Sequence, residues 1–279
     1  KQGNLSVALP KLQSALAIRE ASQNWVSMAS ISNNLGLISY SLKDYEEAAD
    51  YYRQGLNLLK NVENRRLEGS LLSNLAEVLI PLGQLDEAEA NLQKALRLEL
   101  QANEPRTVAY TYFNLGELHS KKGDRQVAIS YFEKALSLQE SIEDKWAIAL
   151  SRLRLAEEQW FLGKADMALS QLDKGHDLAK SLNALSLLQD YAGLLSEIYD
   201  YKGDTMRAQY HAEQRDWLKS RIQLDQIASN QEQSDILIVE RSPENSISTV
   251  QTATIVILGI MILILILENA RLRNRSKSL

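Results

Sequence analysis

The chain has 279 residues, of which 45% are hydrophobic and 24% are charged, and its formal net charge is −5. The negative charge argues against a nucleic-acid-binding surface, because such a surface needs a basic patch. The absence of cysteine excludes disulfides and thiol chemistry, while it leaves the redox compartment open. Only 4 prolines and 12 glycines interrupt a composition dominated by helix-forming residues, so we expect an almost entirely α-helical chain.

One sequence pattern recurs along the chain with a period of 40 residues and without any insertion. Its copies begin at Gly3, Lys43, Gly83, Gly123, Gly163 and Gly203. A strict period of this size is typical of a solenoid. We therefore predict a repeat domain over residues 1–216, made of a half repeat followed by five repeats. Because the chain starts halfway through a repeat, we expect it to be a fragment of a longer protein.

Each repeat is expected to be a helix-turn-helix hairpin. In residues 106–143, apolar side chains recur in steps of three and four, which indicates two amphipathic helices. Between them stands KKGD, where Gly123 can adopt the positive φ that ends a helix and Asp124 can cap the next one.

Small and large residues alternate at fixed stations of the repeat, as helices packed closely together require. The small stations carry Ala8, Ala48, Ala88, Ala128, Ala168 and Ala208, and then Ala15, Gly55, Ala95, Ala135 and Gly175. The large station between them carries Leu12, Tyr52, Leu92, Phe132 and Leu172. The first helices add Leu35-Gly36, Leu75-Ala76, Leu115-Gly116 and Leu155-Ala156. We predict that these stations form the core between the helices.

With the motifs NLGLISY (34–40), NLAEVLI (74–80) and NLGELHS (114–120) in phase, the chain resembles a tetratricopeptide repeat array with repeats nearer forty residues than thirty-four. The resemblance implies an all-α fold, a right-handed α-solenoid of helix-turn-helix repeats. It also implies that the first helix of each hairpin lines a concave groove in which a protein or peptide segment binds.

The candidate groove residues form two rows on the first helices. One station carries Asn34, Asn74, Asn114 and Arg154, and the station three residues later carries Glu77, Glu117, Glu157 and Glu197. Residues three apart share a helix face, so the rows should run side by side. Asparagine offers a donor and an acceptor to a peptide main chain, and the glutamates favour a basic or amine-bearing ligand. Alternatively, both rows are solvated polar faces in which each Glu pairs with a basic residue of the adjacent repeat.

The sequence after the repeats predicts a membrane anchor. Residues 217–244 indicate a linker helix that continues the last repeat, ends before Pro243, and could form a coiled coil and a homodimer. Residues 245–267 contain no charge and are long enough for a single transmembrane helix. The basic segment 268–279 then predicts a cytoplasmic C-terminus, with the repeats outside the cytoplasm, in a bacterial periplasm.

No phosphate-binding loop, nucleophile elbow or metal-binding motif is present in the sequence, so we predict no catalytic residues, no metal and no cofactor. The residues given are not expected to form an enzyme. Two functions remain open. The chain would be the extracytoplasmic sensor of a single-pass signalling protein, of the histidine kinase or diguanylate cyclase type, whose output domain is absent from these residues. Alternatively, it would be a membrane-tethered scaffold for envelope protein assembly that sends no signal.

Overall fold

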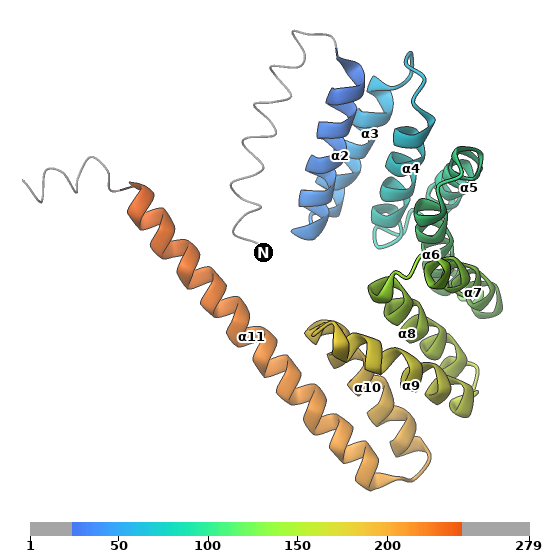
Figure 1. Cartoon of the computed structure of the whole chain (residues 1–279), viewed down its shortest axis with the longest axis vertical. Coiled ribbons are helices and arrows are strands. Elements are labelled where there is room, and N and C mark those ends of the chain that lie inside the picture. The colour runs from blue at the N-terminus through green and yellow to red at the C-terminus, as the bar shows by residue number, and fades with distance from the viewer. Residues whose placement is uncertain (1–23, 242–279) are drawn as a thin grey trace, which may run out of the picture. The chain divides into compact units, whose positions relative to one another are not determined.

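The computed structural model describes residues 24–241, and within this range the chain forms ten helices and no strand (Figure 1). The helices are α2 (Trp25–Ser41), α3 (Tyr45–Leu58), α4 (Arg65–Leu79), α5 (Leu85–Ala102), α6 (Pro105–Lys122), α7 (Arg125–Ser141), α8 (Lys145–Phe161), α9 (Ala165–Ser181), α10 (Leu185–Tyr201) and α11 (Thr205–Arg241). The predicted half repeat before Trp25, the predicted span 245–267 and the basic tail 268–279 lie outside the described residues.

The helices pack as consecutive antiparallel hairpins, which confirms the predicted all-α repeat solenoid. The pairs α2 and α3, α4 and α5, α6 and α7, and α8 and α9 are in close contact, and each second helix packs against the next hairpin. First helices of adjacent hairpins also touch, α2 with α4, α4 with α6 and α8 with α10. The first helices therefore line up on one face of the solenoid. Its right-handed sense stays a prediction.

The turn inside each hairpin is built by one residue with positive φ. Gly123 has a φ of 85° and ends α6, as predicted. Gly83, Gly163 and Gly203 repeat this conformation, and Lys43 adopts it without being glycine. The same left-handed conformation also occurs between hairpins, where no glycine marks it, at Asn103, Glu143 and Asn183.

The predicted capping role of Asp124 was wrong in its detail. Asp124 occupies the residue before α7, but its side chain makes no capping hydrogen bond. Its carboxylate lies 3.2 Å from Nδ1 of His119 instead, and its backbone carbonyl accepts from the Ala128 amide at 3.0 Å. The carboxylate is drawn back toward the preceding helix because an imidazole lies within reach there.

The predicted stations form the core between the helices. Buried residues at the small and large stations are Ala48, Ala88, Ala128, Ala168, Ala208, Gly55, Ala95, Ala135, Gly175, Tyr52, Leu92, Phe132 and Leu172. The size of each large residue is matched by its neighbour. Gly36 and Gly116 face the aromatic rings of Tyr52 and Phe132, whereas in the other repeats Ala76 and Ala156 occur with Leu92 and Leu172.

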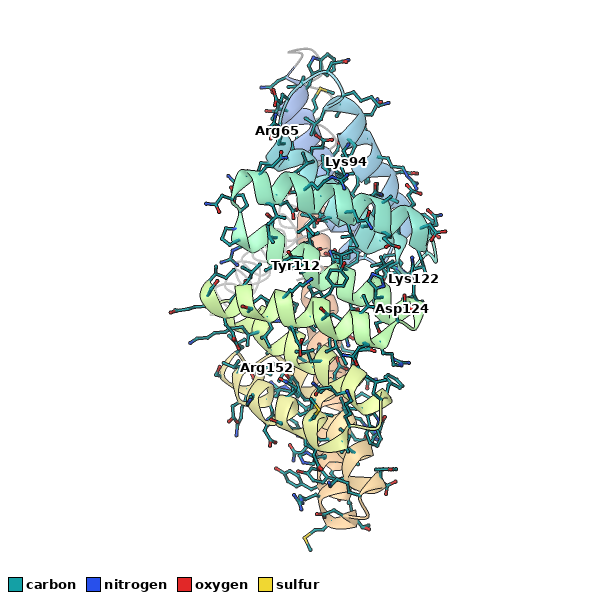
Figure 2. All side chains as sticks on the ribbon, turned by 90° about the vertical axis from the view of Figure 1, so that its right-hand side faces the viewer. Arg65, Lys94, Tyr112, Lys122, Asp124 and Arg152 are labelled. Carbon is teal, nitrogen blue, oxygen red and sulfur yellow. The ribbon has the colours of Figure 1, made fainter. Side chains whose placement is uncertain are left out.

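Ion pairs on the outer surface join adjacent hairpins. Lys122, on the face shown in Figure 2, donates to Glu89 at 2.5 Å. Arg53 lies 3.1 Å from Glu87 in the same manner, 34 residues further along the chain. Because both side chains of the second pair are nearly half exposed, such pairs contribute only about 0.2 to 1 kcal/mol each. The buried stations therefore carry most of the contact energy between repeats.

The last helix runs past the end of the repeats. α11 extends from Thr205 to Arg241, and the linker helix over residues 217–244 stays a prediction. The described residues up to Asp225 form one compact unit. Between residues 24 and 241, none of the helices has both the length and the apolar character that a bilayer-spanning helix requires.

Candidate functional site

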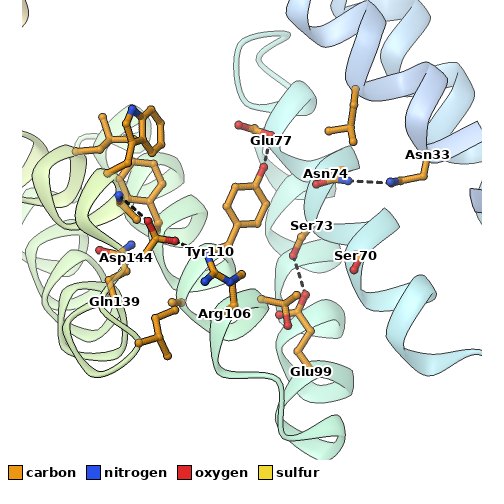
Figure 3. A pocket seen from close by; sticks show the side chains of 18 residues that line it. Asn33, Ser70, Ser73, Asn74, Glu77, Glu99, Arg106, Tyr110, Gln139 and Asp144 are labelled. Atoms are coloured by element: carbon orange, nitrogen blue, oxygen red, sulfur yellow. Dashed lines mark hydrogen bonds and ion pairs between the residues drawn. The ribbon is translucent and has the colours of Figure 1, made fainter. Parts of the chain in front are cut away.

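A cavity of about 560 Å³ opens on the face lined by the first helices (Figure 3). Its walls come from α2, α4, α6 and α8, together with Glu99 of α5, the end of α7 and the turn that follows it. Apolar side chains form a large part of these walls, among them Ala109, Phe113, Leu150 and Trp146. The indole of Trp146 is 55% exposed although it borders the cavity. An exposed tryptophan beside a cavity offers a flat apolar surface to a ligand.

Hydrogen-bonded pairs stand along the rim of the cavity. Nδ2 of Asn74 donates to Oδ1 of Asn33 at 2.9 Å, which links α4 to α2 (Figure 3). On the other side of the opening, Nη1 of Arg106 lies 2.5 Å from the Asp144 carboxylate. Gln139 lines the cavity and is only 4% exposed, and its Oε1 is buried without a hydrogen-bond partner among the described residues. The wall of the cavity therefore contains a buried acceptor that has no hydrogen bond.

Glu77 forms the acidic side of the cavity. Its carboxylate accepts a hydrogen bond from the hydroxyl of Tyr110 on the next first helix. Burial raises the pKa of Glu77, and hydrogen bonds from Tyr110 and Tyr40 offset only part of that rise. No basic side chain pairs with Glu77 among the described residues, so its charge is open to a cation.

A buried carboxylate lies at the inner end of the cavity. Glu99 of α5 is only 2% exposed, and it accepts hydrogen bonds from Thr111 at 2.7 Å and from Ser73 at 3.3 Å. Burial raises the pKa of Glu99, while the two hydroxyl groups lower it by a smaller amount. The repeat places Gln139 at the equivalent station, one repeat later. Two neighbouring repeats thus direct polar groups into positions that Leu59 and Ala179 fill elsewhere.

A second acidic cluster surrounds one arginine on α6, α8 and α10. Nε of Arg154 lies 3.0 Å from Glu117, and its Nη1 lies 2.8 Å from Glu157. Burial raises the pKa of both glutamates, and the guanidinium offsets this only in part. Burial raises the pKa of Asp190 as well, and the charge of Arg154 lowers it by a smaller amount. Three carboxylates thus share a single cation.

The structure separates the predicted groove residues into three environments. Asn74 and Glu77 line the cavity, whereas Glu117, Arg154 and Glu157 form the second cluster. The remaining three are placed differently, with Asn34 and Glu197 exposed and Asn114 only 2% exposed. The asparagine ladder stays a prediction. The alternative hypothesis was that each glutamate pairs with a basic residue of the adjacent repeat. Glu117 does so, with Arg154, but among the described residues Glu77 does not.

Sequence reasoning missed the residues that shape the cavity most. Glu99, Gln139 and Trp146 were not selected as groove residues, since the first two belong to second helices. A signal was present, because stations 99 and 139 carry polar residues whereas the repeats on either side carry Leu59 and Ala179 there. In the described part of the chain, no group of three or more His, Asp or Glu side chains could hold a metal ion.

Comparisons with known families and structures agree with this architecture. A family model described as tetratricopeptide repeat matches residues 67–141, and a second model of the same description matches residues 29–62. Residues 29–62 and 67–141 of the solenoid are tetratricopeptide repeats. This fold generally serves as a non-enzymatic scaffold. No curated protein sequence matches the chain.

Several solved structures share the fold of the tetratricopeptide array. BtubC (BKLC) from P. vanneervenii superposes with a TM-score of 0.66 at 16% identity, over 78% of this chain and 92% of that one. A Rap protein complexed with competence and sporulation factor gives 0.59 at 19% identity, over 79% and 71%. The Rap conjugation gene regulator of plasmid pLS20, in complex with the Phr* peptide, gives 0.57 at 18%, over 79% and 70%. At these identities the likeness concerns the fold alone.

Proposed function

We propose that the concave face of the tetratricopeptide array binds an extended peptide or protein segment that carries a basic residue. The observation that carries this proposal is the excess of acceptors over cations on that face. Glu77 has no basic partner among the described residues, and Arg154 alone serves Glu117 and Glu157. A ligand that supplies N–H donors would satisfy these groups.

The shape of the site supports a peptide rather than a small charged molecule. The cavity is walled by apolar groups such as Phe113 and Trp146, so an apolar side chain of the ligand fits beside a basic one. Two of the structures with a similar fold are complexes, one with competence and sporulation factor and the other with the Phr* peptide.

The proposal is tested by selecting peptides from a random library on the full chain and measuring their affinity by fluorescence anisotropy. The double variant Glu117→Gln and Glu157→Gln is expected to weaken a selected basic peptide about tenfold or more, because charged hydrogen bonds are worth roughly 1.5 to 3 kcal/mol. Glu46→Gln and Glu133→Gln serve as the matched control, since both residues are exposed on second helices. Equal affinity for the double variant and the control would contradict the proposal.

We further propose that the array is the extracytoplasmic sensor of a single-pass signalling protein, with a histidine kinase or diguanylate cyclase type of output. The support is the sequence order of repeats, linker helix, apolar segment 245–267 and basic segment 268–279. A membrane-tethered scaffold is the second candidate, and the same groove would serve it. A cytoplasmic response that depends on peptide binding separates the two.

The orientation is tested by thiol labelling, which the absence of native cysteine makes simple. Ser137→Cys, exposed on α7, is expected to react in intact cells with a reagent that cannot cross membranes, whereas Ser276→Cys should react only after lysis. The reverse pattern would mean that the repeats lie in the cytoplasm.

A further inference from the structure

The outward face of α11 differs in chemistry from that of every other described second helix. Three outward stations are exposed in all five of these helices. In α3, α5, α7 and α9 they carry charged, polar or small residues, namely Glu46, Asp50 and Asn57, then Asp86, Ala90 and Arg97, then Gln126, Ser130 and Ser137, then Asp166, Ser170 and Asp177. In α11 the same stations carry Met206, Tyr210 and Trp217, which are 85%, 57% and 60% exposed.

The face of α11 against which a further repeat would pack is more polar than the same face of α9. In α9 the corresponding stations hold Leu172, Gly175 and Ala179, all buried. In α11 they hold Ala212, Arg215 and Lys219. Arg215 occupies the small station and Lys219 the station of Ala179, and such a bulky charged pair does not fit against another hairpin. We infer that no further hairpin packs on α11. Its large apolar side chains lie at the outward stations instead.

The outward stripe has the spacing of a coiled-coil seam. Tyr210, Trp217 and Leu224 are seven residues apart, and Leu224 is 62% exposed. If these three occupy the a positions of a heptad, Met206 falls at d, four residues before Tyr210. A seven-residue repeat of apolar side chains keeps two helices in register along their length.

We propose that this outer stripe, defined as Met206, Tyr210, Trp217 and Leu224, is the seam of a parallel homodimer in which α11 packs along α11 of a second copy. The four side chains cover one side of the helix, while Ala208 and Leu218 on the opposite side are 6% exposed and pack inward. A helix with two apolar sides requires two partners, and the array supplies only one.

Charges beside the stripe support a second copy in parallel orientation. In this heptad Asp216 takes a g position and Arg221 takes the e position five residues later. In a parallel pair, such g and e residues of the two chains face each other across the seam. Their present partners are neighbours on the same helix, Arg215 at 2.9 Å and Asp225 at 3.3 Å, and all are exposed. Such contacts are weak, so both residues can re-pair across the dimer.

Two polar residues limit the strength of the seam. Glu213 and Ser220 occupy d positions in this heptad, and both are exposed. Two Glu213 carboxylates would approach each other in the dimer, which opposes association. The dimer is consequently expected to dissociate on dilution.

Cysteine cross-linking tests the parallel arrangement in the full chain. Single variants Tyr210→Cys, Trp217→Cys and Leu224→Cys are expected to form disulfide-linked dimers under mild oxidation, because identical a positions meet across a parallel seam. The controls Asn57→Cys and Ser137→Cys stand at the Trp217 station of earlier repeats and should remain monomeric. Cross-linking no greater than the controls overturns the dimer, and cross-linking of only one of the three overturns the parallel register.

A charge exchange distinguishes dimerisation through this seam from non-specific hydrophobic association. Asp216→Lys is expected to weaken dimerisation, measured by sedimentation equilibrium, roughly two- to fivefold per ion pair lost. Adding Arg221→Glu should restore it, because the pair is then rebuilt with its signs exchanged. If the double variant is no tighter than Asp216→Lys alone, the two residues do not meet. If Trp217→Ser dimerises as strongly as the unchanged chain, the stripe is not the seam.

Discussion

A Gly116→Ala variant is expected to lose about 3 kcal/mol of unfolding free energy, because its new methyl group has no room. A Cβ atom built on Gly116 would lie 2.5 Å from Cδ1 and Cε1 of Phe132. The Phe132 ring is fully buried and cannot turn out of the way. Either the ring or the backbone of α6 must shift, and both are held by packing on each side. Urea denaturation followed by circular dichroism measures the loss.

The double variant Gly116→Ala and Phe132→Leu is expected to recover much of that loss. Two other repeats already combine alanine with leucine at these stations, as Ala76 with Leu92 and Ala156 with Leu172. Phe132→Leu alone should cost roughly 1 to 3 kcal/mol, since it leaves space beside Gly116. The two costs are therefore expected to be far from additive. Simple additivity would mean that the two residues do not compensate each other.

Gly193→Ala provides the matched control. Gly193 also lies inside a first helix, α10, but the nearest atom to an added Cβ is Cδ of Arg215 at 3.7 Å. Without a clash, replacing a helical glycine by alanine is expected to raise stability by about 0.5 to 1 kcal/mol. Opposite signs at Gly116 and Gly193 would show that close packing, and not the loss of glycine itself, causes the effect.

The periodic part of the fold could be predicted from the sequence because the same physical requirement recurs in every repeat. Close helix pairs need small residues, so the alanine station from Ala48 to Ala208 identified the buried positions. A hairpin turn with positive φ favours glycine, and Gly83, Gly123, Gly163 and Gly203 marked four turns. The turns at Asn103, Glu143 and Asn183 were not marked, since other residues adopt that conformation at a modest energetic cost.

The candidate site could be predicted only in part, because it depends on how far apart the helices lie. Periodicity treated Asn34, Asn74 and Asn114 as equivalent, yet the structure leaves the first exposed and buries the other two. Their environments differ since each depends on the neighbouring helix and on its particular side chains. Tyr110 meets Glu77 from 33 residues away, and no spacing rule within one repeat indicates that contact.

The second large effect is expected for the buried carboxylate beside the cavity. Glu99→Gln should raise the free energy of unfolding at neutral pH and leave it almost unchanged at pH 4. Burial raises the pKa of Glu99 in the folded chain, so the folded state holds its proton at a pH where the unfolded state has lost it. Stability from this group is thus fully present below its unfolded pKa, near 4.5, and decreases as the pH rises through the folded pKa.

The size of the effect follows from the distance between the two pKa values. Each pH unit by which the folded pKa lies above the unfolded one costs about 1.4 kcal/mol at high pH. Glutamine avoids this cost because it stays neutral, and its amide can still bond the hydroxyls of Ser73 and Thr111. The chain already uses glutamine at the equivalent station, as Gln139.

Denaturant unfolding at a series of pH values between 4 and 8 measures this difference. The unchanged chain should lose stability across that window, with Glu77, Glu117 and Glu157 contributing in the same direction, since burial raises the pKa of each. Glu99→Gln should flatten the profile, whereas Glu133→Gln, an exposed change on α7, should leave it unaltered. A difference between Glu99→Gln and the unchanged chain that stays constant with pH would show that Glu99 keeps its charge when buried, with Ser73 and Thr111 compensating fully for the loss of water.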